Sequence, residues 1–238
     1  MVSIAEALKR ASQQLDHAGV AEARREASSL LGHVIAKDRT FLISHAEDLL
    51  SEDELKRFET AIERRAAGEP AQYITGTQDF FGRAFRVTPD VLIPRPETEL
   101  LVEAALEVMK TDSAICDVGT GSGCIAITLL CERREARAVA VDVSQAALEV
   151  ARENARNLLV DDRIEFKLSD CFAAFGSSAE LFDVVVSNPP YVAANALPGL
   201  QREVRDHEPL VALSPGDDGL SVIRRLLNDS PPFLKSHG

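Results

Sequence analysis

Asp117-Val118-Gly119-Thr120-Gly121-Ser122-Gly123 joins a short apolar run, Ala114–Val118, to a helical pattern over residues 122–134. A glycine-rich turn between a strand and a helix is where a doubly wound sheet binds a nucleotide-like ligand. Glycine lets the backbone approach such a ligand, and the helix N-terminus presents free N–H groups to it. The G-x-G-x-G spacing is one residue tighter than the dinucleotide fingerprint, and it does not match the phosphate-binding P-loop pattern. The stretch therefore predicts a nucleoside site without a phosphate cradle.

Two acids follow the next two predicted strands of the chain. Asp142 closes a strand at Ala138–Val141, where its carboxylate can accept from both ribose hydroxyls and would repel a 2′-phosphate. The alternative is that Asp142 or Ser144 caps the following helix. Asp170 follows a strand at Ile164–Leu168 and could accept from the exocyclic amine of adenine, with capping again as the alternative. Together with the loop, the two acids favour S-adenosyl-L-methionine over NAD.

From residue 113 onward, apolar runs alternate with helical patterns. Helices are predicted over residues 145–157 and 220–227 as well as 122–134, and strands at Ala114–Val118, Ala138–Val141, Ile164–Leu168 and Phe182–Val186. Strands that are apolar almost throughout are typical of a parallel sheet covered on both faces. The predicted fold class is α/β, with a Rossmann-like parallel sheet.

Ser187-Asn188-Pro189-Pro190-Tyr191 ends the fourth predicted strand. The prolines fix φ and make this turn rigid, and the sheet order brings it beside the glycine loop. The Asn188 amide oxygen and a proline carbonyl are neighbouring acceptors, which match an NH2 group on an sp² carbon. Tyr191 supplies a flat face for a planar group. The alternative is an ordinary strand-ending turn.

An amide or aromatic amine nitrogen is a poor nucleophile because its lone pair is delocalised. Hydrogen bonds accepted from both of its N–H groups push electron density back onto the nitrogen and aim it along the S–CH3 axis. Positioning of this kind can supply several kcal/mol of the barrier. The motif therefore predicts methyl transfer to such a nitrogen, with the sulfonium of the cofactor providing the intrinsic reactivity.

The first part of the chain has a helical pattern. Apolar residues recur at helical spacing up to Gly68-Glu69-Pro70, and Ser51 with Glu54 forms a capping box. Residues 71–93 indicate a short hairpin or linker, and a further helix follows Pro94 through about Met109. We predict a helical domain over residues 1–70, a hairpin or linker over 71–96 and a methyltransferase domain over 97–238.

Composition limits the class of protein. The 238 residues correspond to about one to two domains, and no apolar run approaches a membrane span or a signal peptide, so we expect a soluble cytoplasmic protein. The net charge of −12 disfavours nucleic acid as a main partner. The four cysteines form no C-x-x-C pair, and no metal site is predicted. We interpret them as small core residues in a reducing compartment.

The chain resembles the release-factor glutamine N5-methyltransferases. The resemblance rests on residues 70–76, Ile93–Glu99, Asp117–Gly123 and Asn188–Tyr191, and covers most of the chain. The motif at Asn188 is shared with amino-methyltransferases acting on adenine, whereas the combination with Arg95–Glu99 is more specific. The implied substrate is the glutamine of the Gly-Gly-Gln tripeptide in class-1 peptide chain release factors, which are held with the help of the helical domain. The implied process is protein methylation in translation termination.

The resemblance also implies residue roles. Gly119, Thr120, Gly121, Ser122 and Gly123 would line the methionine and ribose, and Asp142 would hold the ribose hydroxyls. Asp170 and Cys171 would border the adenine, although the family often has an aromatic residue at the position of Cys171. Asn188, Pro189, Pro190 and Tyr191 would hold the glutamine amide, with Asn188 also close to the cofactor.

Two alternatives to glutamine methylation are an adenine-N6 nucleic-acid methyltransferase and a fragment that binds cofactor without turnover. The family continues with further strands beyond Gly238, so we expect this chain to be either truncated or only the ordered part of a longer one, with the strand before Asn188 as a bare sheet edge.

Overall fold

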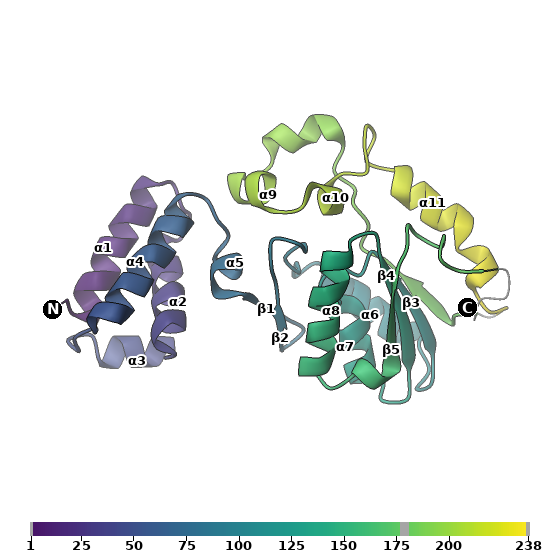
Figure 1. The fold of residues 1–238 in the computed structure, drawn as a ribbon, viewed down its shortest axis with the longest axis horizontal. Coiled ribbons are helices and arrows are strands. Elements are labelled where there is room, and N and C mark those ends of the chain that lie inside the picture. Colours follow the sequence, from purple (N-terminus) through teal and green to yellow (C-terminus); the bar gives the residue numbers. More distant parts are fainter. Residues whose placement is uncertain (1, 177–180, 237–238) are drawn as a thin grey trace. The chain divides into compact units, whose positions relative to one another are not determined.

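The computed structural model describes residues 2–176 and 181–236 (Figure 1). The chain divides into two compact units. The helical unit comprises Met1–Gly76 with Arg202–His207, and the sheet unit comprises Thr77–Gln201 with Glu208–Gly238. Each unit has its own apolar core.

The helical unit is built from amphipathic helices, which confirms the helical pattern predicted for this part of the chain. It contains α1 (Ile4–His17), α2 (Ala23–Ile35), α3 (Arg39–Ser44), α4 (Glu52–Ala66), α5 (Ala71–Thr75) and α9 (Arg202–His207). Apolar residues at helical spacing form its core, among them Leu15, Leu30, Leu31, Phe58 and Ile62. The predicted capping box is confirmed, because the Ser51 and Glu54 side chains each accept from the other residue's backbone N–H. Short α5 follows Pro70, in a segment predicted as linker or hairpin.

The sheet unit contains a parallel sheet of four strands. Their order is β5-β4-β3-β6, and the strands are β3 (Ala114–Val118), β4 (Arg137–Asp142), β5 (Ile164–Leu168) and β6 (Val184–Val186). Three strands match their predicted positions within one residue at either end. The fourth begins at Val184 because Phe182 forms an isolated parallel bridge with Leu234 instead. A separate antiparallel hairpin, β1 (Thr77–Phe80) and β2 (Arg83–Arg86), lies in the segment for which the sequence indicated a short hairpin or linker.

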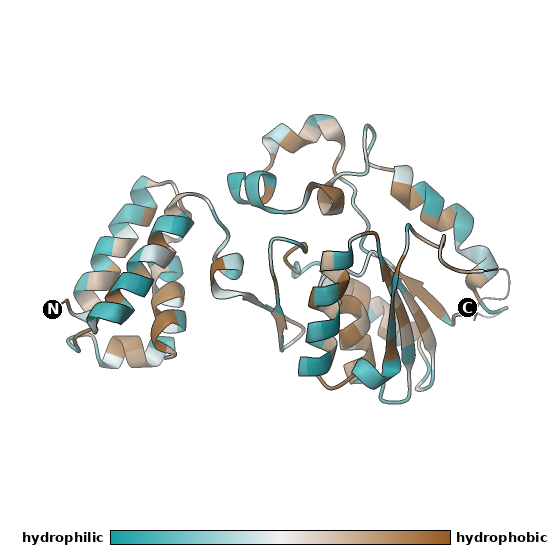
Figure 2. Ribbon diagram, viewed as in Figure 1, coloured by the Kyte–Doolittle hydropathy of each residue, from teal (hydrophilic) through white to brown (hydrophobic). Residues whose placement is uncertain are grey.

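Helices cover both faces of this sheet (Figure 1), as the apolar strand pattern predicted. Strand residues such as Ile115 and Ala138 pack in one core with α6 (Thr98–Val108), α7 (Cys124–Glu132) and α8 (Gln145–Asn157). Residues one position further along, such as Cys116 and Val139, pack on the other face with α11 (Ser221–Asp229). Figure 2 shows the strands as mostly hydrophobic and the flanking helices as two-sided.

Short elements connect these parts. They are η1 (Asp161–Arg163), η2 (Ala194–Gly199), α10 (Leu210–Leu213) and η3 (Pro231–Phe233).

The expectation that the strand before Asn188 is a bare sheet edge is wrong for the start of that strand, at Phe182. Phe182 N–H donates to the Phe233 carbonyl at 2.7 Å, and Lys235 N–H donates to the Phe182 carbonyl at 2.9 Å. The chain returns here because Phe233 stacks on Phe172, with ring centroids 4.8 Å apart. Within the described residues, Val184–Val186 forms its ladder with β3 alone.

None of the helices in the described part of the chain combines the length and apolar character that a membrane span requires. Over the same residues, no group of three or more His, Cys, Asp or Glu side chains is arranged to hold a metal ion.

Candidate active site

A cavity of about 480 Å³ lies in the sheet unit, at the carboxyl ends of the strands. This is the edge at which an open parallel sheet binds its ligand, and the volume is in the range of small-molecule sites. Most of the predicted site residues line it: Gly119, Thr120, Gly121, Ser122, Asp142, Asp170, Cys171, Asn188, Pro189 and Pro190. Gly123 and Tyr191 are not among its lining residues.

The glycine loop, Gly119–Gly123, is fixed by backbone hydrogen bonds to β4. The N–H groups of Gly119 and Thr120 both donate to the Val141 carbonyl, at 2.8 and 3.0 Å. Gly121 has a φ of 56°, and a Cβ added there would meet no atom within 4 Å. The loop therefore presents bare backbone to open space in the cavity.

Gly123 has a different role from the other glycines of the loop. Its φ is 82°, and an added Cβ would lie 2.6 Å from Ile127 Cδ1 and 3.2 Å from Ala151 Cβ. Glycine is needed here because α7 begins in close contact with α8. The predicted cofactor contact of Gly123 remains a prediction.

Asp117, near the end of β3, holds the glycine loop through hydrogen bonds. Its Oδ2 accepts from Thr120 Oγ1 at 2.7 Å and from Ala126 N–H at 3.3 Å, while Oδ1 has no partner among the described residues. Complete burial raises the pKa of this carboxyl to about 6, although the two hydrogen bonds oppose the shift. Asp117 belongs to the glycine-rich stretch of the sequence, but it was not predicted as a site residue.

Asp142 braces the glycine loop from β4. Its Oδ2 accepts from Gly121 N–H at 2.8 Å, and its Oδ1 accepts from Ser144 N–H at 2.9 Å. The cap of α8 is Ser144, whose Oγ accepts from Ala147 N–H at 3.1 Å. A carboxylate has about four lone-pair sites, so Asp142 keeps capacity to accept from a ligand.

The residues that follow β5, Ser169–Cys171, also line the cavity. The Asp170 carboxylate accepts two hydrogen bonds from Arg225 Nη1, at 3.0 and 3.1 Å, and its side chain is largely exposed. This ion pair competes with the predicted hydrogen bond to adenine. Cys171 is buried with a φ of 48°, and its carbonyl accepts from Ser169 Oγ at 2.7 Å.

The Asn188 loop, Ser187–Tyr191, follows β6. Ser187 Oγ donates to the Val118 carbonyl at 2.6 Å, which joins this loop to the end of β3. Asn188 Nδ2 donates to Thr98 Oγ1 at 3.4 Å, a long hydrogen bond that directs the amide NH2 toward the start of α6. Tyr191 is 65% exposed.

Several side chains at or near this cavity were not predicted from the sequence. Thr98 and Ser187 orient the Asn188 loop, and Glu208 accepts from Arg95 and from Ile93 N–H. Thr98 and Arg95 belong to the stretch that carried the family resemblance, so that stretch was the available signal. The sequence offers no comparable signal for Glu208, which comes 113 residues after Arg95 in the chain.

All four cysteines pack in the apolar cores, which confirms their interpretation as core residues, and Cys171 also lines the cavity. Burial raises the pKa of both the Cys116 and the Cys124 thiols to about 12, and it also raises the pKa of Cys171. These groups remain protonated thiols near neutral pH, so they are unsuited to act as nucleophiles.

Comparisons with known proteins decide which family has these features. The chain matches the family description "PrmC N-terminal domain" over residues 6–76 and "Methyltransferase small domain" over residues 96–203. It is 48% identical over 234 residues to the release factor glutamine methyltransferase of Cereibacter sphaeroides, covering 98% of this chain and 82% of that protein. The chain belongs to the release factor glutamine methyltransferase family.

Other members of the release factor glutamine methyltransferase family give the same result. The Koribacter versatilis protein is 43% identical over 239 residues, which is 100% of this chain and 84% of the relative. The Bacillus subtilis protein is 42% identical over 241 residues, which is 99% of this chain and 82% of the relative. The resemblance inferred from the motifs is therefore confirmed.

One solved structure supports the fold. The catalytic domain of hMettl16, solved in complex with an RNA hairpin, has a TM-score of 0.51 and 18% identity. The match covers 76% of this chain and 63% of that chain. With the methyltransferase domain match, it confirms the predicted Rossmann-like methyltransferase fold.

The cavity of this family member fits an adenosyl cofactor without phosphates. Side chains at Gly119 and Gly121 would enter open space that borders the cavity, so the glycines leave room for a ligand against the backbone. An acceptor, Asp142, lies beside this space. S-adenosyl-L-methionine has the ribose hydroxyls that such a carboxylate can bind and no phosphate that it would repel.

Proposed function

We propose that this chain transfers a methyl group from S-adenosyl-L-methionine to a glutamine side chain. The acceptor is the amide nitrogen N5 of the glutamine in the Gly-Gly-Gln motif of class-1 peptide chain release factors. The proposal is carried by the Asn188 loop and the glycine loop lining one cavity, in a chain of this family. The process it serves is protein methylation in translation termination.

The Asn188 loop provides the acceptors for the substrate amide. Because Asn188 Nδ2 donates to Thr98 Oγ1, the amide oxygen Oδ1 is left to accept from a substrate N–H. The Pro189 carbonyl is a second acceptor one residue further along the chain. Two acceptors fix the orientation of a primary amide NH2, and the rigid prolines Pro189 and Pro190 preserve their spacing. Tyr191 offers a planar face to the same amide.

The cofactor supplies an electrophilic methyl group on a positively charged sulfur. Gly119, Thr120, Gly121, Ser122 and Gly123 would hold its methionine and ribose portions, and Asp142 its ribose hydroxyls. Asp170 and Cys171 would border its adenine. Asn188 would touch both the cofactor and the substrate.

Transfer would form a bond between the amide nitrogen and the methyl carbon as the carbon–sulfur bond breaks. The cofactor, held by the glycine loop and Asp142, would leave as S-adenosyl-L-homocysteine with the bonding electron pair on its sulfur. The alkylated nitrogen then loses one proton to water, since alkylation makes that proton acidic. Asn188 and Pro189 act by orienting the nitrogen for in-line attack, a contribution of several kcal/mol in well-oriented reactions.

We further propose the organisation and partners of the protein. Residues 1–70 form a substrate-binding helical domain, 71–96 a hairpin or linker and 97–238 the methyltransferase domain. The protein acts as a monomer in the cytoplasm, with no metal and no direct nucleic-acid or membrane partner. The net charge of −12 supports a protein substrate over a phosphate backbone. Family membership likewise does not favour adenine-N6 methylation.

The test is transfer of labelled methyl from S-adenosyl-L-methionine. A class-1 release factor, its variant with alanine in place of the Gly-Gly-Gln glutamine, and duplex DNA are offered in parallel. We expect label on the unaltered release factor alone. Label on DNA would support the adenine alternative, and cofactor binding without any label would support the inactive fragment.

A further inference from the structure

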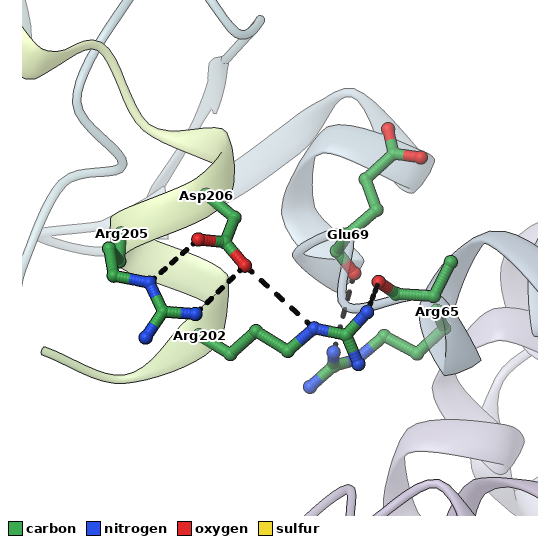
Figure 3. A network of polar contacts seen from close by, with 6 residues as sticks. Arg65, Glu69, Arg202, Arg205 and Asp206 are labelled. Carbon is green, nitrogen blue, oxygen red and sulfur yellow. Dashed lines mark hydrogen bonds and ion pairs between the residues drawn. The ribbon is translucent and has the colours of Figure 1, made fainter. Parts of the chain in front are cut away.

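Arg65 and Asn154 are buried polar side chains, one in each unit. Arg65 donates to the Glu69 carbonyl at 3.3 Å (Figure 3). Its ion pairs with Glu26 and Glu203 likewise stay within the helical unit. Asn154 of α8 is 1% exposed and lies in the sheet unit, where its hydrogen bonds reach the glycine loop and the end of β2. Asn154 therefore bears on the candidate active site.

The first partner of Asn154 is the Ser122 carbonyl of the glycine loop, to which Nδ2 donates at 2.8 Å. This carbonyl lies just outside the hydrogen-bond ladder of α7, which starts with Ile127 N–H donating to the Gly123 carbonyl at 2.9 Å. On the other side of the same peptide, Gly123 N–H donates to the Thr120 carbonyl at 2.8 Å. The peptide between Ser122 and Gly123 is thus held at both of its polar groups, and Asn154 supplies one of the two contacts.

The second partner is the backbone of Arg86, the last residue of β2. Arg86 N–H donates to Asn154 Oδ1 at 2.7 Å, and Asn154 Nδ2 donates to the Arg86 carbonyl at 3.0 Å. One side chain therefore serves two carbonyls with its NH2 group and one N–H with its oxygen. An asparagine amide provides both kinds of group, whereas a carboxylate can only accept.

Arg86 leads into another part of the cavity lining. Val87 and Val91 are buried, and the lining includes Asp90, Val91, Leu92 and Pro94. We name residues 90–94 the Asp90 wall. Ser122 also lines the cavity, so the two partners of Asn154 belong to, or lead into, two different parts of its lining.

Close packing between the glycine loop and α8 supports the same contact. A Cβ added at Gly123 would lie 3.2 Å from Ala151 Cβ. Ala151 is fully buried and lies three residues before Asn154, on the same face of α8. The loop therefore rests on this face of α8 through both packing and a hydrogen bond.

We propose that Asn154 is a positioning residue for the cofactor. It holds the glycine loop and the start of the Asp90 wall at a fixed spacing, and S-adenosyl-L-methionine binds between them. Asn154 is not among the residues that line the cavity, so it acts through Ser122 and Arg86. The inference rests on the cofactor of the proposed function, and it is independent of the molecule that accepts the methyl group.

The first test uses wild type and amide hydrogen exchange with and without S-adenosyl-L-homocysteine. Bound ligand should slow exchange at Arg86, whose N–H is bonded to Asn154. The control amide is Phe81 of the same hairpin, whose N–H donates to Glu99 at 2.8 Å. We expect the slowing at Arg86 to exceed that at Phe81 by about fivefold or more, because the ligand stabilises the network around Asn154.

The second test compares the Kd of S-adenosyl-L-homocysteine in two variants. Asn154→Ser removes the NH2 donor, and Asn154→Asp keeps the shape but turns an acceptor toward two carbonyls. We expect binding to weaken about 10-fold in Asn154→Ser and further in Asn154→Asp, as buried hydrogen bonds that support the site are lost. The KM for S-adenosyl-L-methionine should rise in parallel, with kcat at saturating cofactor within about threefold of wild type.

Two controls separate this role from general stability. Glu153→Gln removes the exposed ion pair of α8 with the Arg86 side chain and should bind like wild type. Val160→Ala removes packing from the same core at a residue that does not line the cavity. It should lower the midpoint of thermal unfolding with little change in Kd.

The outcomes separate this inference from the proposed function. A wild-type Kd in Asn154→Ser, or an equal loss of affinity in Val160→Ala, would overturn the role of Asn154. Equal slowing at Arg86 and Phe81 in wild type would overturn it even if neither Asn154 variant folds. A wild-type protein that binds S-adenosyl-L-homocysteine but does not methylate release factor would overturn the proposed function alone.

Discussion

The glycine loop and the Asn188 loop line the same cavity, but they are held by different kinds of contact. The glycine loop is fixed by groups from β3 and β4, among them Asp117, Val141 and Asp142. The Asn188 loop depends on Thr98, 90 residues earlier. It also depends on the carbonyls of Leu213 and Gly216, which accept hydrogen bonds from the chain just after the loop. The cofactor side of the site is thus built locally, whereas the substrate side is assembled from distant segments.

The largest effect should come from removing the central acceptor of the Asn188 loop. Asn188→Ala should lower turnover by about 100- to 1000-fold, because the substrate nitrogen loses its orientation. The Kd of the cofactor, measured by calorimetry, should change little. Equal losses in turnover and in cofactor affinity would place Asn188 on the cofactor side and break the distinction between the two loops.

The corresponding change on the cofactor side is Asp142→Ala. We expect cofactor binding to weaken by about 1–3 kcal/mol, as for a lost charge-assisted hydrogen bond. Ser144→Ala is the control, since it removes the α8 cap and should cost about 1 kcal/mol of stability without altering cofactor affinity. An unchanged Kd in Asp142→Ala would limit Asp142 to bracing the loop.

Thr98→Val tests the distant support of the Asn188 loop. The variant keeps the branched shape but loses the oxygen that accepts from Asn188 Nδ2, so turnover should fall about 10-fold. Cofactor affinity should not change. Thr98→Ser keeps the hydroxyl and should retain most activity. Equal turnover in the two variants would show that the hydrogen bond from Asn188 to Thr98 does not support the loop.

The smallest effect is expected for Asp117→Asn, and it concerns how the free energy of unfolding depends on pH. Burial raises its folded-state pKa to about 6, above the ordinary 3.8, so the folded state binds more protons between these values. The contribution of Asp117 to the free energy of unfolding should therefore decrease as pH rises from about 4 to about 6. Denaturant unfolding of wild type and Asp117→Asn should show the difference between them declining over this range, and a constant difference would contradict the buried carboxyl.

The difference between local and long-range contacts also explains which features could be predicted from the sequence. The four strands, the helices between them and the capping box were predictable because their periodicity and their cap residues are local. The glycine loop and Asp142 were predictable because they lie at successive strand ends of one sheet. The assignments to ribose, adenine and glutamine amide remain predictions.

The parts that could not be predicted are non-local. Pairing of Glu208 with Arg95, of Glu203 with Arg65 and of Phe182 with Leu234 depends on how distant segments meet in space. The sequence pattern also gave no reason to place α9 with the helical unit, since its short polar stretch has no apolar face to reveal a packing partner.

In the proposed function, the Asn188 loop directs methylation to a glutamine amide. Mass spectrometry of a release factor treated with wild type or Asn188→Ala tests this role most directly. We expect one methyl group on the side-chain amide nitrogen of the Gly-Gly-Gln glutamine with wild type, and little or none with Asn188→Ala. A methyl group on another residue, or equal methylation by both proteins, would contradict it.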